Sequence, residues 1–225
     1  MDWRTRIACP SVIPLLERLL AGIRSVLGRR LFGLYVTGSL AAGGYVSGRS
    51  DIDFVAATTS VLPEALLHKL AAMHREITSS GLDQANHLEG VYVSRRALRR
   101  FDPGAADYPA LRADGSFGVD RHTSGWVIQL HLLREHGIPL TGPDPRELVD
   151  PVSPAELRGA TLSILREWWA PRLADPAILR GADYQAYAVL TMCRVLYTVW
   201  HGEVVSKDTA ARWAGGYLAP RQWIA

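Results

Sequence analysis

The sequence VTGSLAAGGYVSGRSDIDFVA, from Val36 to Ala56, decides how this chain folds, because a glycine-rich segment is followed by two aspartates inside an apolar run. An ionised carboxylate in a buried strand is costly unless a partner compensates its charge. Alternate residues of a strand point to the same side, so Asp51 and Asp53 share one face while Ile52 points to the other. The pair therefore predicts a strand with an apolar face toward the core and a carboxylate face toward a partner.

The glycine-rich segment before the aspartates suits a nucleoside triphosphate. Gly38 lets backbone N–H groups approach a phosphate closely, and Ser39 adds a hydroxyl donor. Two carboxylates on one face supply oxygen ligands to Mg²⁺, an ion that also contacts the phosphates of a substrate. Ser50, directly before Asp51, is a further candidate for nucleotide binding. The sequence therefore predicts Mg²⁺ as the partner of Asp51 and Asp53.

Hydrophobic periodicity on both sides of this segment predicts an α+β fold with a small mixed sheet flanked by helices. We expect the following elements: helices over 12–27, 63–81 and 126–137, strands over 31–38, 51–58 and 87–96, a long loop over 102–125 and a turn over 138–145. Everything from Ser153 onward has helical spacing. The chain is thus expected to form an α+β domain, residues 1–150, followed by an all-α domain, residues 151–225.

The composition of the 225 residues limits the classes of function. The net charge is +3, and the basic residues are spread along the chain and not gathered in a stripe, which argues against a nucleic-acid partner. No apolar run reaches the length of about 18 residues that a membrane span needs. The N-terminus does not resemble a signal peptide, so we expect a cytoplasmic protein. Cys9 and Cys193 have no metal-ligand spacing and are expected to be free thiols.

The segment GSLAAGGYVSGRSDID, residues 38–53, resembles the signature of the nucleotidyltransferase superfamily that includes DNA polymerase beta: Gly-Ser, about a dozen residues, then Asp-x-Asp. The superfamily also uses a third carboxylate on a neighbouring strand. Glu89, in HLEGVYV, stands where that strand is expected; a structural position at a strand edge is the alternative for it. The resemblance implies two Mg²⁺ ions held by Asp51, Asp53 and Glu89, with Glu89 accepting the proton of the attacking hydroxyl.

Two downstream segments, HGIPLTGPDPRELVDPVSPAEL (136–157) and VLTMCRVLYTVWHGEVVSKDTAARWA (189–214), are similar to segments of the aminoglycoside adenylyltransferases that modify streptomycin and spectinomycin. This resemblance implies transfer of AMP from ATP to a hydroxyl of a small cationic acceptor, with release of pyrophosphate. It also implies that Lys207 contacts the ATP phosphates from the helical domain. The alternative for Lys207 is an exposed lysine in the first turn of a helix, next to a capping Ser206.

The acceptor is the part on which the sequence departs from that family. The drug-facing helix begins here with GADYQAYAVLTM, so Asp183 is the nearest candidate for its acidic residue, with Glu89 and Asp120 as further acidic groups. Trp126 is the nearest candidate for the tryptophan of the drug site.

Two alternatives to an antibiotic-modifying enzyme stay open. One is the same reaction on a protein side chain or an RNA end, and the other is a nucleotide-binding regulatory, antitoxin-like protein without turnover. Family members also continue beyond the segment that ends here at Ala225, so we expect the family's last helix to be absent or its reading frame altered.

Overall fold

The computed structural model describes residues 2–105, 107–174, 177 and 181–218. The chain divides into two compact units, which we call the sheet unit and the helical unit. The sheet unit consists of Met1–Thr123 and Gln129–Pro151, and the helical unit of Ser124–Ile128 and Val152–Ala225. The helical unit therefore includes a short segment, 124–128, from within the range 1–150.

A mixed six-stranded sheet forms the centre of the sheet unit. Its strands are β1 (Leu31–Val36), β2 (Ile52–Thr58), β3 (Leu88–Ser94), β4 (Tyr108–Leu111), β5 (Phe117–Asp120) and β6 (Ile138–Thr141). They lie in the order β5-β4-β3-β2-β1-β6, and every neighbouring pair is antiparallel except β2 and β3, which are parallel. The fold is α+β, as the sequence predicted, and the starts of β2 and β3 lie at the same edge of the sheet.

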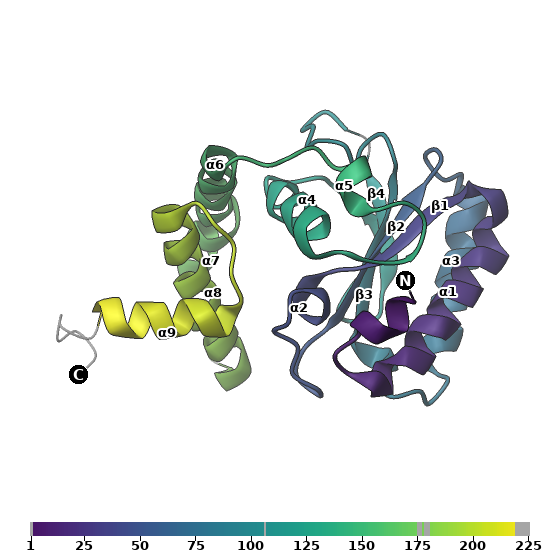
Figure 1. Cartoon of the computed structure of the whole chain (residues 1–225), viewed down its shortest axis with the longest axis horizontal. Coiled ribbons are helices and arrows are strands. Elements are labelled where there is room, and N and C mark those ends of the chain that lie inside the picture. Colours follow the sequence, from purple (N-terminus) through teal and green to yellow (C-terminus); the bar gives the residue numbers. More distant parts are fainter. Residues whose placement is uncertain (1, 106, 175–176, 178–180, 219–225) are drawn as a thin grey trace. The chain divides into compact units, whose positions relative to one another are not determined.

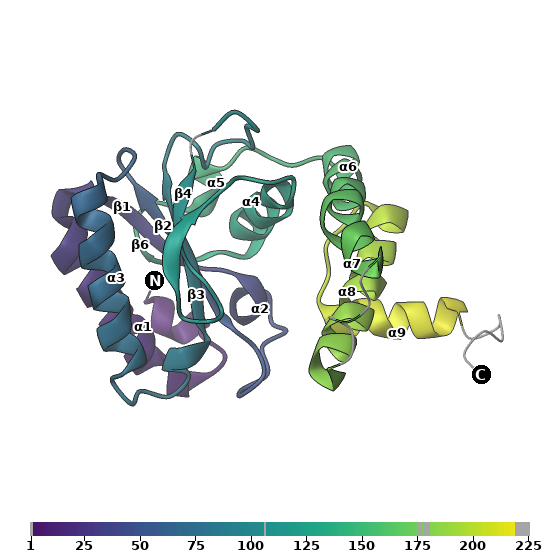
Figure 2. The ribbon, with the colours of Figure 1, turned by 180° about the vertical axis from the view of Figure 1, so that it is seen from behind.

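Helices cover both faces of this sheet (Figures 1 and 2). The long helices α1 (Ile13–Leu27) and α3 (Glu64–Thr78) lie side by side on one face. On the other side lie α2 (Gly38–Ala41) and α4 (Gly125–His136), and α5 (Pro145–Leu148) follows β6. Short 3-10 turns complete the unit: Trp3–Arg6, Pro10–Val12, Gly28–Arg30 and Ala85–His87.

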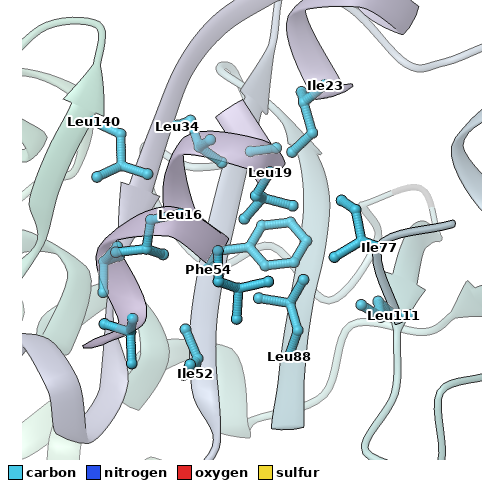
Figure 3. Close-up of a cluster of buried hydrophobic side chains, with 14 of the residues drawn as sticks. Leu16, Leu19, Ile23, Leu34, Ile52, Phe54, Ile77, Leu88, Leu111 and Leu140 are labelled. Carbon is cyan, nitrogen blue, oxygen red and sulfur yellow. The ribbon is translucent and has the colours of Figure 1, made fainter. Parts of the chain in front are cut away.

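The hydrophobic core lies between the sheet and the pair α1 and α3. Figure 3 shows Ile52 and Phe54 of β2 and Leu88 of β3 among the leucines and isoleucines of this core, and all three are nearly inaccessible to solvent. Because alternate residues of a strand point to opposite sides, burial of these residues places Asp53 and Glu89 on the face away from α1 and α3. The core thus determines which side of the sheet carries the carboxylates.

Two of the loop predictions are wrong. The range 102–125 contains the hairpin β4–β5, and the range 138–145 contains β6, which pairs with β1 at the sheet edge. In the hairpin turn Gly115 has a φ of 77°, and the Arg112 N–H donates to the Ser116 carbonyl (2.9 Å). An Asp-Gly pair is a strong hairpin signal, but each strand here has only four residues, too few for a periodic pattern to emerge.

The helical unit is built from consecutive helices. These are α6 (Pro154–Ile164), a π-helical turn (Leu165–Trp169), α7 (Ala170–Ala174), α8 (Ala182–His201) and α9 (Lys207–Leu218). Ser153 and Glu156 cap the start of α6 reciprocally: the Glu156 N–H donates to Ser153 Oγ (3.3 Å), and the Ser153 N–H donates to Glu156 Oε2 (2.9 Å).

None of the helices in the described part of the chain has both the length and the apolar character needed to cross a membrane. The expectation about the last helix of the family concerns residues 219–225, which lie outside the described residues.

Candidate active site

Strand register brings two of the predicted carboxylates together. In the parallel pair β2 and β3, Asp53 is aligned with Glu89, just as Ile52 is aligned with Leu88. Neighbouring strands of a sheet lie about 4.8 Å apart, and aligned residues point to the same side. Asp53 and Glu89 are therefore adjacent on the sheet face away from the core.

Asp51 lies one residue before β2, close to Asp53 and Glu89. We call these three carboxylates the acidic group. The Oδ1 of Asp51 is 3.7 Å from Nδ1 of His87, which ends the 3-10 turn before β3. His87 was not among the residues that the sequence predicted for the site. A signal was present, because His87 and Glu89 are spaced like Asp51 and Asp53, and two parallel strands in register place such pairs side by side.

The electrostatic environment of Glu89 reflects this crowding. Burial and, to a smaller extent, the negative charges of Asp51 and Asp53 together raise the pKa of Glu89 to about 7. A carboxyl group with this pKa is close to half protonated at neutral pH. A group that titrates near the operating pH is suited to general acid–base catalysis.

Gly38 allows α2 to pack directly against the acidic group. Its φ of 62° is left-handed, and a Cβ built at this position would overlap the carboxylate of Asp53. The Thr37 N–H also donates to the carbonyl of Asp53 (2.9 Å). Glycine is therefore required here for two independent reasons, backbone conformation and space. Ser39, the second residue of α2, follows directly.

Ser50 has a structural role in the glycine-rich loop. Its Oγ accepts a hydrogen bond from the Val46 N–H (3.0 Å), and its own N–H donates to the Val46 carbonyl (2.9 Å). The Gly48 N–H donates to Oε1 of Gln84 (3.3 Å) and joins the loop to the segment before β3. These bonds fix the loop between α2 and β2, and a contact of Ser50 with the nucleotide stays a prediction.

The carboxylates near the starts of β2 and β3 have the chemistry of an open magnesium site. Among the described residues no three His, Cys, Asp or Glu side chains converge as they would in a closed metal site. Mg²⁺ is usually bound by one or two carboxylates together with substrate phosphates and water, so the pair Asp51 and Asp53 still fits this ion. Glu89 as a third ligand stays a prediction.

The remaining predicted residues lie elsewhere. Lys207 and Trp126 belong to the helical unit, and Trp126 is only 5% exposed. Asp183 lies in the first turn of α8, and its side chain is outside the described part of the structure. Asp120 pairs with Arg112, so its charge is compensated within the β4–β5 hairpin.

Comparisons with known proteins identify a family and several relatives with similar sequences. Residues 147–224 match the family described as "Aminoglycoside adenylyltransferase, C-terminal domain". A spectinomycin 9-adenylyltransferase of Staphylococcus aureus is 26% identical over 208 residues, which is 85% of this chain and 74% of that protein. An aminoglycoside (3'') (9) adenylyltransferase of Escherichia coli is 28% identical over 211 residues, 88% of this chain and 76% of that protein.

A solved structure has the same fold. The spectinomycin adenyltransferase AAD(9) from Enterococcus faecialis, determined with ATP and spectinomycin, superposes with a TM-score of 0.70 at 18% sequence identity. The match covers 91% of this chain and 82% of that one.

The sheet topology, the Gly-Ser turn and the carboxylates at the starts of β2 and β3 are the features expected of a nucleotidyltransferase. The family that matches residues 147–224 and the relatives that cover most of the chain indicate a particular branch of these enzymes. Residues 147–224 match the C-terminal domain of the aminoglycoside adenylyltransferases, and the chain as a whole is similar to these enzymes.

Proposed function

We propose that this enzyme is a Mg²⁺-dependent adenylyltransferase that transfers AMP from ATP to a hydroxyl group of an aminoglycoside or aminocyclitol antibiotic such as spectinomycin. Relatives that cover most of the chain are named for this activity on spectinomycin or aminoglycosides. We also propose that the enzyme acts in the cytoplasm.

Asp51 and Asp53 would hold Mg²⁺ together with the phosphates of ATP. Bound Mg²⁺ would stabilise the developing charge on the attacking and leaving oxygens of an in-line displacement. The acceptor oxygen forms a bond to the α-phosphorus of ATP, the bond from that phosphorus to the bridging oxygen breaks, and pyrophosphate leaves. Glu89 takes the proton of the acceptor hydroxyl, which makes that oxygen a better nucleophile.

The other predicted residues have binding roles in this proposal. Backbone N–H groups at Gly38 and the hydroxyl of Ser39 would contact the phosphates, with the ammonium group of Lys207 as a further contact. We propose that Asp183 and Trp126 contact the acceptor. Charge favours an acidic partner such as Asp183, because the acceptor is cationic.

One observation carries the proposal: Asp53 and Glu89 are in register on parallel strands, with Asp51 near enough to raise the pKa of Glu89. Acidic groups concentrated in this way repel one another, which disfavours the empty site. A cation and a proton-accepting role explain why they are placed together.

The test is pyrophosphate release from ATP and Mg²⁺ across a panel of aminoglycosides and spectinomycin. Wild type should release pyrophosphate only with particular acceptors, and Asp53→Asn should lower the rate on the order of 10³-fold. Glu76→Gln is the matched control, because Glu76 is an exposed acid on α3. Equal loss in both variants, or no release with any acceptor of the panel, would overturn the proposal.

A further inference from the structure

The two aspartates of the acidic group are placed by different parts of the sheet unit. Asp53 lies inside β2, where it is aligned with Glu89, and its carbonyl accepts the Thr37 N–H (2.9 Å). Asp51 lies outside the strand pairing, which starts at Ile52, and its side chain is 48% exposed. A carboxylate that binds a metal ion has to be held in a defined orientation. Strand pairing and close packing do not supply this for Asp51.

The short turn before β3 lies next to Asp51. It is the 3-10 turn Ala85–His87, and the His87 N–H donates to the carbonyl of Gln84 (2.9 Å). The parallel register of β2 and β3, continued by one residue, places Asp51 beside His87. Nδ1 of His87 is 3.7 Å from Oδ1 of Asp51, so a movement of about 0.5 Å would bring the two atoms within hydrogen-bond distance.

The same turn also contacts the glycine-rich loop that leads to Asp51. The Gly48 N–H donates to Oε1 of Gln84 (3.3 Å), and Nε2 of Gln84 donates to Oδ1 of Asp83 (3.0 Å). Hydrogen bonds at both atoms of the amide therefore fix the orientation of the Gln84 side chain. Gln84 and His87 contact the end of the loop at two points, one at Gly48 and the other at Asp51.

Gln84 has an uncommon backbone conformation. Its φ of 62° and ψ of 14° are left-handed, and it is the one non-glycine residue with a positive φ in the described part of the chain. A residue with a side chain stays in this region only when its surroundings hold it there. The next residue, Ala85, is buried in the core and anchors the turn. Glycine would adopt this conformation more easily, but it could not supply the amide that binds Gly48.

We propose that Gln84 and His87 are positioning residues for the metal site and that they act through Asp51. Together they hold the end of the glycine-rich loop, so that the Asp51 carboxylate stays on the same side of the sheet as Asp53. The inference rests on the proposed function, because that function assigns Asp51 to Mg²⁺. Neither positioning residue is assigned a contact with the reacting atoms.

Metal affinity, measured without turnover, tests the role of His87. The probe is Mn²⁺, which accepts the same oxygen ligands as Mg²⁺ and enhances the relaxation of water protons when it is bound. It is titrated into the enzyme together with α,β-methylene-ATP, an analogue from which pyrophosphate cannot leave. His87→Leu should weaken Mn²⁺ binding about tenfold. His87→Asn, whose amide N–H lies near the position of Nδ1, should weaken it by less than about threefold.

His68→Leu is the matched control, because His68 is an exposed histidine of α3, on the opposite face of the sheet. It should bind Mn²⁺ like wild type. Wild-type affinity in His87→Leu, or equal losses in His87→Leu and His68→Leu, would overturn the role of His87.

Gln84→Gly separates positioning from stability. Glycine accepts the left-handed backbone, so the free energy of unfolding without metal should stay close to that of wild type. Mn²⁺ affinity should nevertheless fall about threefold to tenfold, because the hydrogen bond to Gly48 is lost. A merely structural residue would show the reverse, namely lower stability at unchanged Mn²⁺ affinity, and that result would overturn the role of Gln84.

A double-mutant cycle distinguishes failure of this inference from failure of the proposed function. In an Asp51→Ala background, His87→Leu should cause no further loss of Mn²⁺ affinity, because the carboxylate that it positions is gone. An additional, independent loss would overturn the inference and leave the proposed function intact. If Asp51→Ala and Asp53→Ala both bind Mn²⁺ like wild type, the inference and the proposed metal site fail together.

Discussion

The acidic group of the sheet unit and the lysine of the helical unit are held by different kinds of structure. Asp53 and Glu89 are aligned by the backbone hydrogen bonds of two parallel strands, so their proximity follows from register. Lys207 is held by a ring contact between two helices, which depends on how side chains pack. Substitutions near the carboxylates should therefore change the rate of the chemical step, whereas substitutions around Lys207 should change the affinity for ATP.

The largest effect should come from Glu89→Gln, which keeps the shape of the side chain but removes the base. Turnover should fall about 10³-fold. The folded-state pKa of about 7 exceeds the ordinary 4.5, so the folded protein loses stability as pH rises between these values, and the variant avoids this loss. Without Mg²⁺ at pH 8 the variant should be about 1–2 kcal/mol more stable, after allowance for solvent screening.

Urea unfolding at pH 4 and pH 8 measures the stability part of this prediction. The gain should be absent at pH 4, where Glu89 is protonated in both states, and Mg²⁺ should stabilise wild type more than the variant. A variant that is less stable than wild type at pH 8 would contradict the electrostatic account of this site.

Gly38→Ala should have the second largest effect, because the new Cβ overlaps the carboxylate of Asp53. A displacement on the order of 1 Å at such a group costs about 10²-fold in turnover. Gly43→Ala is the matched control: its φ of 79° is also left-handed, but a Cβ there meets nothing within 4 Å. It should lower stability through backbone strain and leave turnover nearly unchanged. Similar losses of turnover in both would show that strain, and not Asp53, is responsible.

The stability of the sheet unit should also fall at acidic pH for a reason that does not involve the carboxylates. Burial lowers the pKa of His74 to about 4, and its Nε2 lies 2.7 Å from the hydroxyl of Tyr92. Below the ordinary value of 6.5 the unfolded chain binds a proton that the folded protein does not bind, so stability falls as pH drops toward 4. The total loss should be about 3 kcal/mol.

Urea unfolding of wild type and His74→Gln across this range tests the prediction, because glutamine does not titrate. The stability difference between the two proteins should change in favour of the variant as pH falls from 6.5 to 4. A difference that is independent of pH would show that His74 becomes protonated without cost in the folded protein.

The sequence predicted the acidic site better than its surroundings, for physical reasons. Alternation predicted Asp51 and Asp53 on one side of a strand; Asp53 lies in β2 with Asp51 directly before it, and the core residues in Figure 3 show why Asp53 faces away from α1 and α3. The alignment of Asp53 with Glu89 depends on the register that the crossover through α3 imposes, and local pattern does not contain it.

Tertiary contacts were the part that the sequence could not predict. Helical spacing does not distinguish a core tyrosine from one that holds a cation, so the contact of Tyr187 with Lys207 became visible only in the structure. In the same way, the sequence made Trp126 a candidate for the drug site but did not indicate that its indole is almost fully buried. Short strands such as β4 and β6 form because neighbouring strands offer hydrogen bonds, which no pattern of four residues predicts.

The smallest effect should come from the cap of α9. Ser206→Ala removes the acceptor of the Thr209 N–H and should cost about 1 kcal/mol of stability. Ser153→Ala removes the cap of α6 in the same unit and should cost a similar amount. Only Ser206→Ala loosens the turn that carries Lys207, so it alone should weaken ATP binding, by a few-fold in calorimetry. If both variants weaken ATP binding equally, the affinity for ATP depends on the stability of the whole helical unit. The position of Lys207 in the first turn of α9 then does not determine that affinity.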